Sequence, residues 1–306
     1  MKRILFSLFS LLCIASSYAI SLNGIEYTID TLSMFPAGPG STYYELRLLR
    51  ADNGLGRLDA FLLAVDTRDP YVQVQQVLGK GKVVGCEIPS SMAKRSTTDT
   101  EIYFGGVNGD FFAYEAPVGT TIINGQYALT PFGSGGGRRH GGIDAEGRGV
   151  TAYTHTYSMQ VQIPDESVLT INHVNGDRLE NELVLYNHHK DATTKTNAYG
   201  TEVKIQLLEG ETWKTTGTMK AKVLAKEENV GSMPLAAGYA VLSGHGSMQK
   251  ELNKLNIGDE LTLSFELRLD DELVNVAQFI GGDHYEAMIL DDGKVAQSGF
   301  WNELHP

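Results

Sequence analysis

The sequence predicts an α+β fold that is predominantly antiparallel or mixed β, with few short helices and a β-rich insertion in a mixed α/β core. Short alternating or apolar runs bounded by Gly, Asn, Asp and Pro recur along the chain, and this pattern is typical of strands separated by turns. Only residues 90–95, preceded by Pro89, and residues 247–255 favour helix. Because the chain has no repeat of fixed period, a propeller or a solenoid is disfavoured.

The expected strands fall into two groups. Shorter ones are expected at residues 43–49, 59–65, 71–78, 119–123 and 183–186. Longer, strongly alternating ones are expected at residues 202–208, 219–224, 239–242 and 260–269, which indicates an inserted antiparallel subdomain. The expected order is a signal peptide (1–19), the first part of the core (20–160), the insertion (161–276) and a return to the core (277–306).

One glycine-rich segment, residues 133–142, is expected to be a mobile loop. Three consecutive glycines precede Arg138, Arg139 and His140 there. The two arginines form a basic pair in an acidic protein, which suits a phosphate group, although a solvated loop also accounts for them.

The first residues predict export. Lys2 and Arg3 precede an apolar run at residues 4–15 and a stretch of small residues, which is typical of a secretory signal peptide cut after Ala19. The run is too short to span a membrane. We therefore expect a secreted, periplasmic or cell-surface protein without a membrane span. A lipoprotein signal at Cys13 is the weaker alternative, because Leu12 stands where such signals usually have a small residue.

Charge and cysteine content narrow the function classes. The chain has 25 basic and 37 acidic residues, and the signal segment holds two of the basic ones, so the mature net charge is −14. Such a charge makes nucleic acid an unfavourable partner but leaves room for a local basic pocket for a phosphorylated ligand. Cys86 is the only cysteine outside the signal segment, so an intramolecular disulfide is excluded.

The strongest local motif is the run at residues 102–112, in which an expected strand leads into Asn108-Gly109-Asp110 and then two phenylalanines. Side chains at strand ends often carry function, and glycine lets a backbone approach a ligand closely. Asn-Gly is also a hairpin signal, and spacing alone favours a tight turn.

The order of the motifs resembles that of the phosphodiester glycosidase family. Asn108-Gly109-Asp110-Phe111-Phe112 is similar to the family's N-G-(G/D)-F-F strand end. The later matches are the Pro117-to-Gly125 hairpin, Gly142-to-Gly147, Leu183-to-Tyr186 with Gly200-to-Val203, Val241-to-Gly246, Leu255-to-Asp259, and Ile280-Gly281-Gly282 with Leu290-to-Gly293. No single match is specific, but together they keep the family's order over about two thirds of the chain.

The resemblance implies hydrolysis of the bond between a sugar's anomeric carbon and a phosphate, as in a GlcNAc-1-phosphodiester. A phosphomonoester is a good anionic leaving group, so one carboxylate facing the anomeric carbon and donors for the phosphate are sufficient. Asp110 and Glu202 are the candidate carboxylates, and Asn108 is the candidate positioning donor. The candidate contacts to sugar or phosphate are His245, Gly282, Asp283, His284, Arg138 and Arg139. No cofactor and no metal are expected.

The sequence departs from the family after His305-Pro306. The family continues with an R-T-(A/S)-x-G strand, a D-G-(R/Q) turn and an L-D-G-G-G-S motif, which this chain lacks. We therefore expect a chain truncated relative to the family, which turns over sugar phosphodiesters poorly or not at all by itself. An unpaired apolar sheet edge would favour self-association.

Other classes of function stay open. A glycan-binding or structural module of the cell surface, without turnover, is the main alternative. A metal-dependent hydrolase is weaker, because His188, His189 and Asp191 are better explained by a polar turn between strands. A serine hydrolase is excluded, because the segment before Ser243 lacks the glycine that a nucleophile elbow requires.

Overall fold

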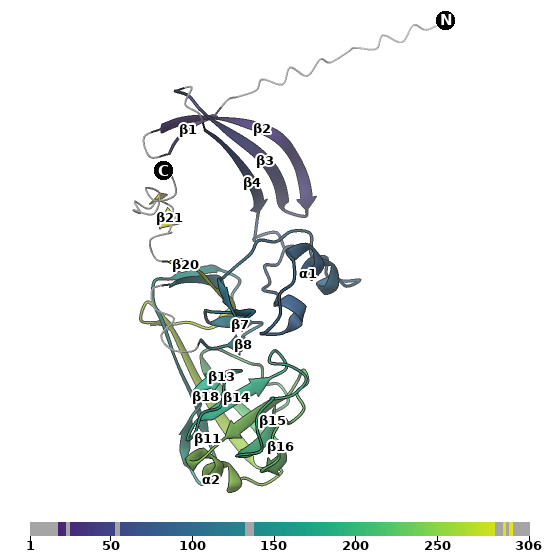
Figure 1. Cartoon of the computed structure of the whole chain (residues 1–306), viewed down its shortest axis with the longest axis vertical. Helices are drawn as coiled ribbons and strands as arrows, with labels where there is room; N and C mark the ends of the chain where they lie inside the picture. The colour runs from purple at the N-terminus through teal and green to yellow at the C-terminus, as the bar shows by residue number, and fades with distance from the viewer. Residues whose placement is uncertain are drawn as a thin grey trace, which may run out of the picture. The chain divides into compact units, whose positions relative to one another are not determined.

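The computed structural model describes residues 18–22, 25–52, 56–131, 138–284, 290–291 and 294–295. The chain divides into two compact units, residues 1–72 and residues 73–306 (Figure 1). The signal segment, apart from its last two residues, lies outside the described residues. No helix in the described part of the chain is long and apolar enough to cross a membrane.

The first unit is an antiparallel four-stranded sheet in which the strands follow one another in chain order. Its strands are β1 (Tyr18–Leu22), β2 (Ile25–Gly38), β3 (Ser41–Arg50) and β4 (Arg57–Val65). Strands β2 and β3 join through Pro39-Gly40, where Gly40 has a φ of 54° that glycine adopts without strain. The expected strands at 43–49 and 59–65 are therefore confirmed.

The second unit begins with irregular chain. A short 3-10 turn, η1 (Gly79–Gly81), precedes helix α1 (Pro89–Ser96), which confirms the helix expected at 90–95. Pro89 is the first helical residue, where a missing N–H costs nothing. The strand expected at 71–78 is wrong: these residues pair with no strand in the described part of the chain, and Leu78 instead packs in a small cluster with Val83 and Leu129.

An antiparallel five-stranded sheet follows, with the order β10-β9-β20-β7-β8. Its strands are β7 (Thr121–Ile123), β8 (Gln126–Leu129), β9 (Arg138–Asp144), β10 (Gly149–Ala152) and β20 (Val276–His284). Phe279 of β20 pairs with Ile122 on one side and with Gly142 on the other. Strand β20 therefore pairs with strands from residues 121–144, whereas residues 18–65 form a sheet of their own. The expected division into a core, an insertion and a return to the core stays a prediction.

Two local expectations are wrong. Residues 138–142 are part of strand β9 rather than a loop, and the rest of the loop expected at 133–142 lies outside the described residues. The glycines mislead because they serve close packing: a Cβ on Gly142 would overlap the carbonyl oxygen of Gln278. The strand expected to lead into Asn108-Gly109-Asp110 is not formed, and Ile102 is 72% exposed.

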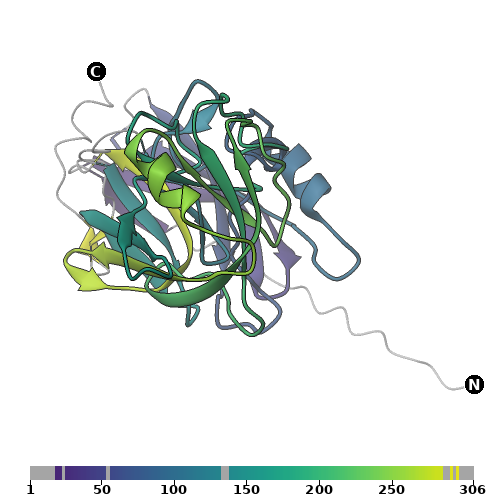
Figure 2. The same ribbon diagram turned by 90° about the horizontal axis from the view of Figure 1, so that it is seen from below.

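The largest sheet has nine strands and is antiparallel except for the pair β13-β14. The strands are β11 (His155–Gln162), β12 (Val168–Thr170), β13 (His173–Val174), β14 (Leu183–Asn187), β15 (Thr201–Leu207), β16 (Gly217–Glu228), β17 (Ala240–Gly244), β18 (Glu260–Leu269) and β19 (Glu272–Leu273). Four expected strands, at 202–208, 219–224, 239–242 and 260–269, coincide with β15 to β18. Figure 2 shows these long strands from below, with α2 (Ser247–Asn253) beside them in light green.

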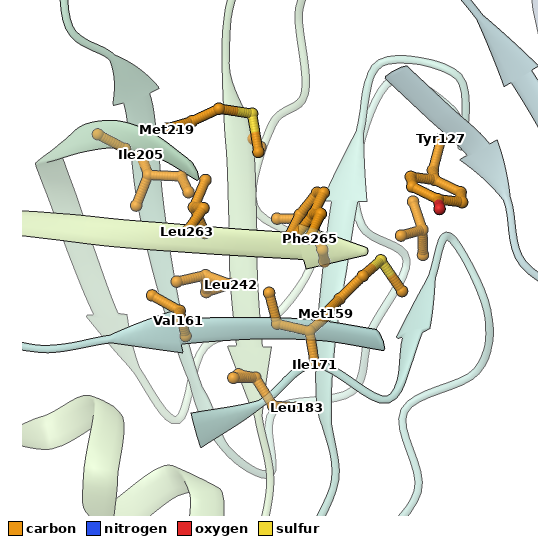
Figure 3. Packing of buried hydrophobic residues seen from close by; sticks show 14 of the residues in the cluster. Tyr127, Met159, Val161, Ile171, Leu183, Ile205, Met219, Leu242, Leu263 and Phe265 are labelled. Carbon is orange, nitrogen blue, oxygen red and sulfur yellow. The ribbon is translucent and has the colours of Figure 1, made fainter. Parts of the chain in front are cut away.

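The main core lies against this sheet. Alternate residues of β18 are buried, among them Leu263 and Phe265, and they pack with Met159, Met219 and Leu242 (Figure 3). Strands β14 and β17 are buried along their whole length, because a second cluster that includes Tyr186 and Met233 covers their other face. Helix α2, which confirms the helix expected at 247–255, adds Leu252 to the main core.

The chain is thus β-rich, with antiparallel and mixed sheets and few helices, as the sequence predicts. The remaining strands are two short pairs, β5 (Phe112–Ala113) with β6 (Ala116–Pro117), and β21 (Leu290–Asp291) with β22 (Lys294–Val295). The mixed α/β character of the core stays a prediction.

Candidate active site

Asp110 is held at the centre of one group of motif residues. Its Oδ2 accepts a hydrogen bond of 2.7 Å from the Gly119 N–H, and its Oδ1 accepts one from the Phe111 N–H. A Cβ on Gly281 would lie 2.7 Å from the Asp110 Cγ, so the carboxylate lies directly against the backbone of strand β20. Asp110 is partly exposed and has a φ of 58°, a left-handed conformation that Asp tolerates better than most residues.

Two histidines border the same place. A Cβ on Gly119 would lie 2.7 Å from His140 Nε2 and 2.9 Å from Asp110 Oδ2, so both groups flank this glycine. The Thr120 N–H donates to His140 Nε2, and the Thr120 hydroxyl lies 2.7 Å from His155 Nε2. The two imidazole rings are 4.1 Å apart, and both contact the ring of Phe279.

Burial keeps His155 neutral. Desolvation lowers the pKa of His155 to about 4, and the neighbouring His140 adds to this effect. His140 Nε2 accepts a backbone N–H, so a neutral His140 carries its proton on Nδ1. The result is a carboxylate supplied with backbone donors beside neutral imidazoles, which suits stabilisation of a developing positive charge.

Some of the other predicted residues lie close to Asp110 in the chain or on the strands β9 and β20. Asn108 is exposed two residues before it, and Gly282 follows Gly281 beside the backbone of Arg139. Arg138 and His284 pair through their backbones in β9 and β20. The side chains of Arg138, Asp283 and His284 lie outside the described residues, so their predicted contacts stay predictions.

Arg139 faces away from this group. Successive side chains of a strand point to opposite faces, and His140 occupies the face toward Asp110. The Arg139 guanidinium instead lies 3.5 Å from the ring centroid of Tyr153, and its charge contributes to lowering the pKa of Asp270. The structure therefore does not bring Arg139 to Asp110.

Glu202 belongs to a different cluster. It is 1% exposed, and its carboxylate accepts hydrogen bonds from the hydroxyls of Thr194, Thr196 and Ser243 and from the Met233 N–H. All of these contacts lie within the part of the fold built from β14 to β17. Four hydrogen bonds to one carboxylate indicate that Glu202 holds its neighbours in position. The catalytic role expected for Glu202 stays a prediction.

Arg178 completes the Glu202 cluster. Its Nη1 donates to Ser243 Oγ at 2.8 Å, and its Nη2 donates to Asn197 and to the Tyr199 carbonyl. Gly200 is required here, because a Cβ would lie 2.8 Å from Arg178 Nη1 and would overlap the Gly244 carbonyl. The Gly200-to-Val203 and Val241-to-Gly246 motifs therefore meet at one cluster of polar side chains that includes the charged groups of Glu202 and Arg178.

His245 lies with the Glu202 cluster rather than with Asp110, since its ring stacks beside that of Tyr199 at 6.3 Å. His188 to Lys190 form a turn after β14, as predicted, and the rings of His188 and His189 are 4.0 Å apart. Among the described residues, no group of three or more His, Cys, Asp or Glu side chains is arranged to hold a metal ion.

Sequence reasoning missed His155 and Arg178 and assigned His140 only to a loop. His155 begins an alternating strand and carries no motif. Arg178 follows Gly176-Asp177, which looks like an ordinary turn. Only their long-range contacts, to Thr120 and to Ser243, mark them.

Comparison with known proteins places the fold but not the activity. No protein-family model matches the sequence, and the search of curated proteins gives no match. Among solved structures, a protein from Burkholderia pseudomallei that is named "exported protein" is similar over 88% of this chain and 74% of its own, with 14% identity and a TM-score of 0.54.

A hypothetical protein from Synechocystis is similar over 86% of this chain, with 12% identity and a TM-score of 0.53. This chain spans 45% of the length of that protein. At these identities the likeness shows a shared fold alone.

Proposed function

We propose that the protein is an exported hydrolase of the phosphodiester glycosidase type, which cleaves the bond between a sugar's anomeric carbon and a phosphate. The observation that supports this most is the placement of Asp110 against Gly119 and Gly281, beside the buried imidazole of His140, which in turn contacts the half-buried imidazole of His155. Asp110, Gly119 and Gly281 come from separate motifs in the sequence, and the fold brings the two glycines to the partly exposed carboxylate.

The proposed chemistry needs little from the protein. The bond between the anomeric carbon and the phosphate oxygen breaks, its electron pair leaves with the phosphate, and water adds its hydroxyl to the carbon. The remaining proton of the water passes to the solvent. Asp110 stabilises the positive charge that develops at that carbon, and the N–H groups of Gly119 and Phe111 hold the carboxylate in position. The phosphate leaves as an anion and needs no strong general acid.

A methyl diester of GlcNAc-1-phosphate provides the test. We expect slow release of GlcNAc by the purified chain and a loss of about 10²-fold or more in Asp110→Asn, which keeps the shape of the side chain but removes its charge. Glu266→Gln, on the exposed side of β18, is the matched control and should keep full activity. Equal rates for the wild type and Asp110→Asn would overturn the proposal.

A glycan-binding module without turnover is the alternative. A pocket beside the Glu202 cluster, lined by charged and hydroxyl side chains and Tyr186, favours it. If the wild type and Asp110→Asn both bind a sugar but neither hydrolyses the methyl diester, the protein is a glycan-binding module rather than an enzyme.

We also propose that the chain is exported through a signal peptide cut after Ala19, which agrees with the name of the Burkholderia neighbour. Its core has mixed α/β character with an insertion at 161–276. Its substrate is a glycan or a sugar phosphate, and the chain self-associates through a sheet edge.

A further inference from the structure

A pocket lies beside the Glu202 cluster. Its volume is about 430 Å³, within the range typical of small-molecule sites. Most of its lining residues carry charged or hydroxyl-bearing side chains, among them Asp177, Arg178, Tyr186, Lys190, Lys195 and Thr196. Asp110 and His140 are not among the lining residues, so the pocket differs from the candidate active site in its residues.

Hydrogen bonds to the buried carboxylate of Glu202 hold the wall of this pocket in place. Thr194 and Thr196 both line the pocket and donate their hydroxyls to the buried carboxylate of Glu202, at 3.1 Å and 3.0 Å. The same carboxylate accepts the Ser243 hydroxyl, which in turn accepts from Arg178. A network in which each member has a partner limits rearrangement, so the pocket is formed before any ligand enters.

Two cations in the wall are partly removed from water. Lys190 Nζ donates to the Asn175 carbonyl at 2.9 Å and lies 5.7 Å from the ring centroid of Tyr186. The hydrogen-bond partners of Arg178 are a hydroxyl, an amide oxygen and carbonyls, all of them uncharged. Burial lowers the pKa of both side chains, which shows that water compensates their charge incompletely.

The acidic groups nearby balance these cations only in part. Lys195 forms an ion pair with Asp191, and Asp177 attracts Lys190. Arg178 is also attracted by Glu202, from which the Ser243 hydroxyl separates it. The lining side chains comprise three cations and two anions. The third anion, Glu202, is covered by the hydroxyls of Thr194, Thr196 and Ser243, so a ligand meets one more cation than anion at the wall itself.

We propose that this pocket binds a sugar that carries one anionic group, with Lys190 and Arg178 facing the anion and Asp177, Thr196 and Asn197 facing the hydroxyls. A phosphate and a carboxylate offer the same anionic oxygens to such cations. Because carboxylate and amide oxygens accept hydrogen bonds from sugar hydroxyls, the mixture of charges in the wall suits a charged sugar better than a bare anion. The inference is independent of the proposed hydrolysis at Asp110.

Titration calorimetry with the full chain tests this proposal. The probes are glucose 6-phosphate, glucuronate, glucose and inorganic phosphate. We expect glucose 6-phosphate or glucuronate to bind at least about tenfold more tightly than glucose or inorganic phosphate, because only they engage both parts of the wall. Tighter binding of glucose 6-phosphate would identify the anion as a phosphate, and tighter binding of glucuronate would identify it as a carboxylate. Binding of inorganic phosphate as tight as that of either charged sugar would overturn the assignment to a sugar.

Variants locate the binding. Lys190→Gln should weaken the charged sugar about tenfold, and Lys195→Glu, which reverses a largely exposed charge at the rim and should not disturb folding, should weaken it as well. Lys250→Gln, an exposed lysine on α2, and Asp110→Asn should bind as the wild type does. Unchanged binding in both pocket variants, or lost binding in Asp110→Asn, would place the ligand elsewhere and overturn the proposal.

Discussion

The Ser243 hydroxyl donates a hydrogen bond of 2.9 Å to the buried Glu202 carboxylate, 41 positions away in the sequence. The same oxygen accepts from Arg178, so one serine connects a buried anion to a half-buried cation. Sequence reasoning examined Ser243 only as a nucleophile. Its position shows instead that it mediates between two charges.

Removing this hydroxyl should destabilise the fold. In Ser243→Ala, Glu202 loses one donor and Arg178 loses one acceptor, and unsatisfied buried polar groups typically cost about 1–3 kcal/mol. We expect the free energy of unfolding in urea to fall by that amount. Ser158→Ala, at an exposed position of β11, is the matched control and should change it little. Equal stabilities of the two variants would show that the Ser243 contacts contribute nothing.

The half-buried histidine His155 predicts how stability depends on pH. Burial lowers the pKa of His155 in the folded chain from its usual 6.5 to about 4, so the unfolded chain binds the proton first as the pH falls. Stability from this group is therefore complete above pH 6.5 and is lost progressively toward pH 4.

His155→Gln should flatten this pH dependence. Unfolding in urea should show a smaller drop between pH 7 and pH 4.5 in the variant than in the wild type. Between pH 7 and pH 8, where His155 is neutral in both states, the two proteins should change in parallel. An equal drop in the acid range would mean that His155 does not contribute.

Most of the larger sheet could be predicted from the sequence, because period-two alternation directly reports burial of one face. The segment of β18, in which Leu261, Leu263 and Phe265 are buried between more exposed residues, shows this. The irregular chain at 71–78 misled the prediction because its residues alternate without any partner strand. Pairing depends on residues distant in sequence, which a local pattern cannot report.

The candidate sites could be predicted only in part. Asp110 and Glu202 stand in recognisable glycine-framed motifs, but the motifs do not show that the two carboxylates have different neighbours. Gly142 illustrates the difficulty: a glycine that allows two strands to approach looks in sequence like a glycine in a loop. His155 and Arg178 gain their roles only from contacts made by the folded chain.

The contact between Gly281 and Asp110 should be essential for activity. A Cβ at Gly281 would lie 2.7 Å from Asp110 Cγ, so Gly281→Ala must displace the carboxylate. Misplacement of a catalytic group by about 1 Å can cost about 10²-fold in rate, and we expect that loss in the hydrolysis of the methyl diester. Gly149→Ala, in strand β10 of the same sheet, meets nothing within 4 Å and should keep the wild-type rate. Full activity of Gly281→Ala would remove Asp110 from the proposed mechanism.

The terminal strand of the first sheet predicts self-association. Strand β4 pairs only with β3 among the described strands, and it exposes Phe61 by 68% and Leu62 by 49%. A long apolar edge strand is a template for pairing with another chain, and lysine on such an edge opposes it. We expect Leu62→Lys to raise the dimer dissociation constant about tenfold in sedimentation velocity experiments. Leu49→Lys, on β3 between two partner strands, is the control for added charge and should leave it unchanged. A wild-type chain that stays monomeric at high concentration would refute pairing through β4.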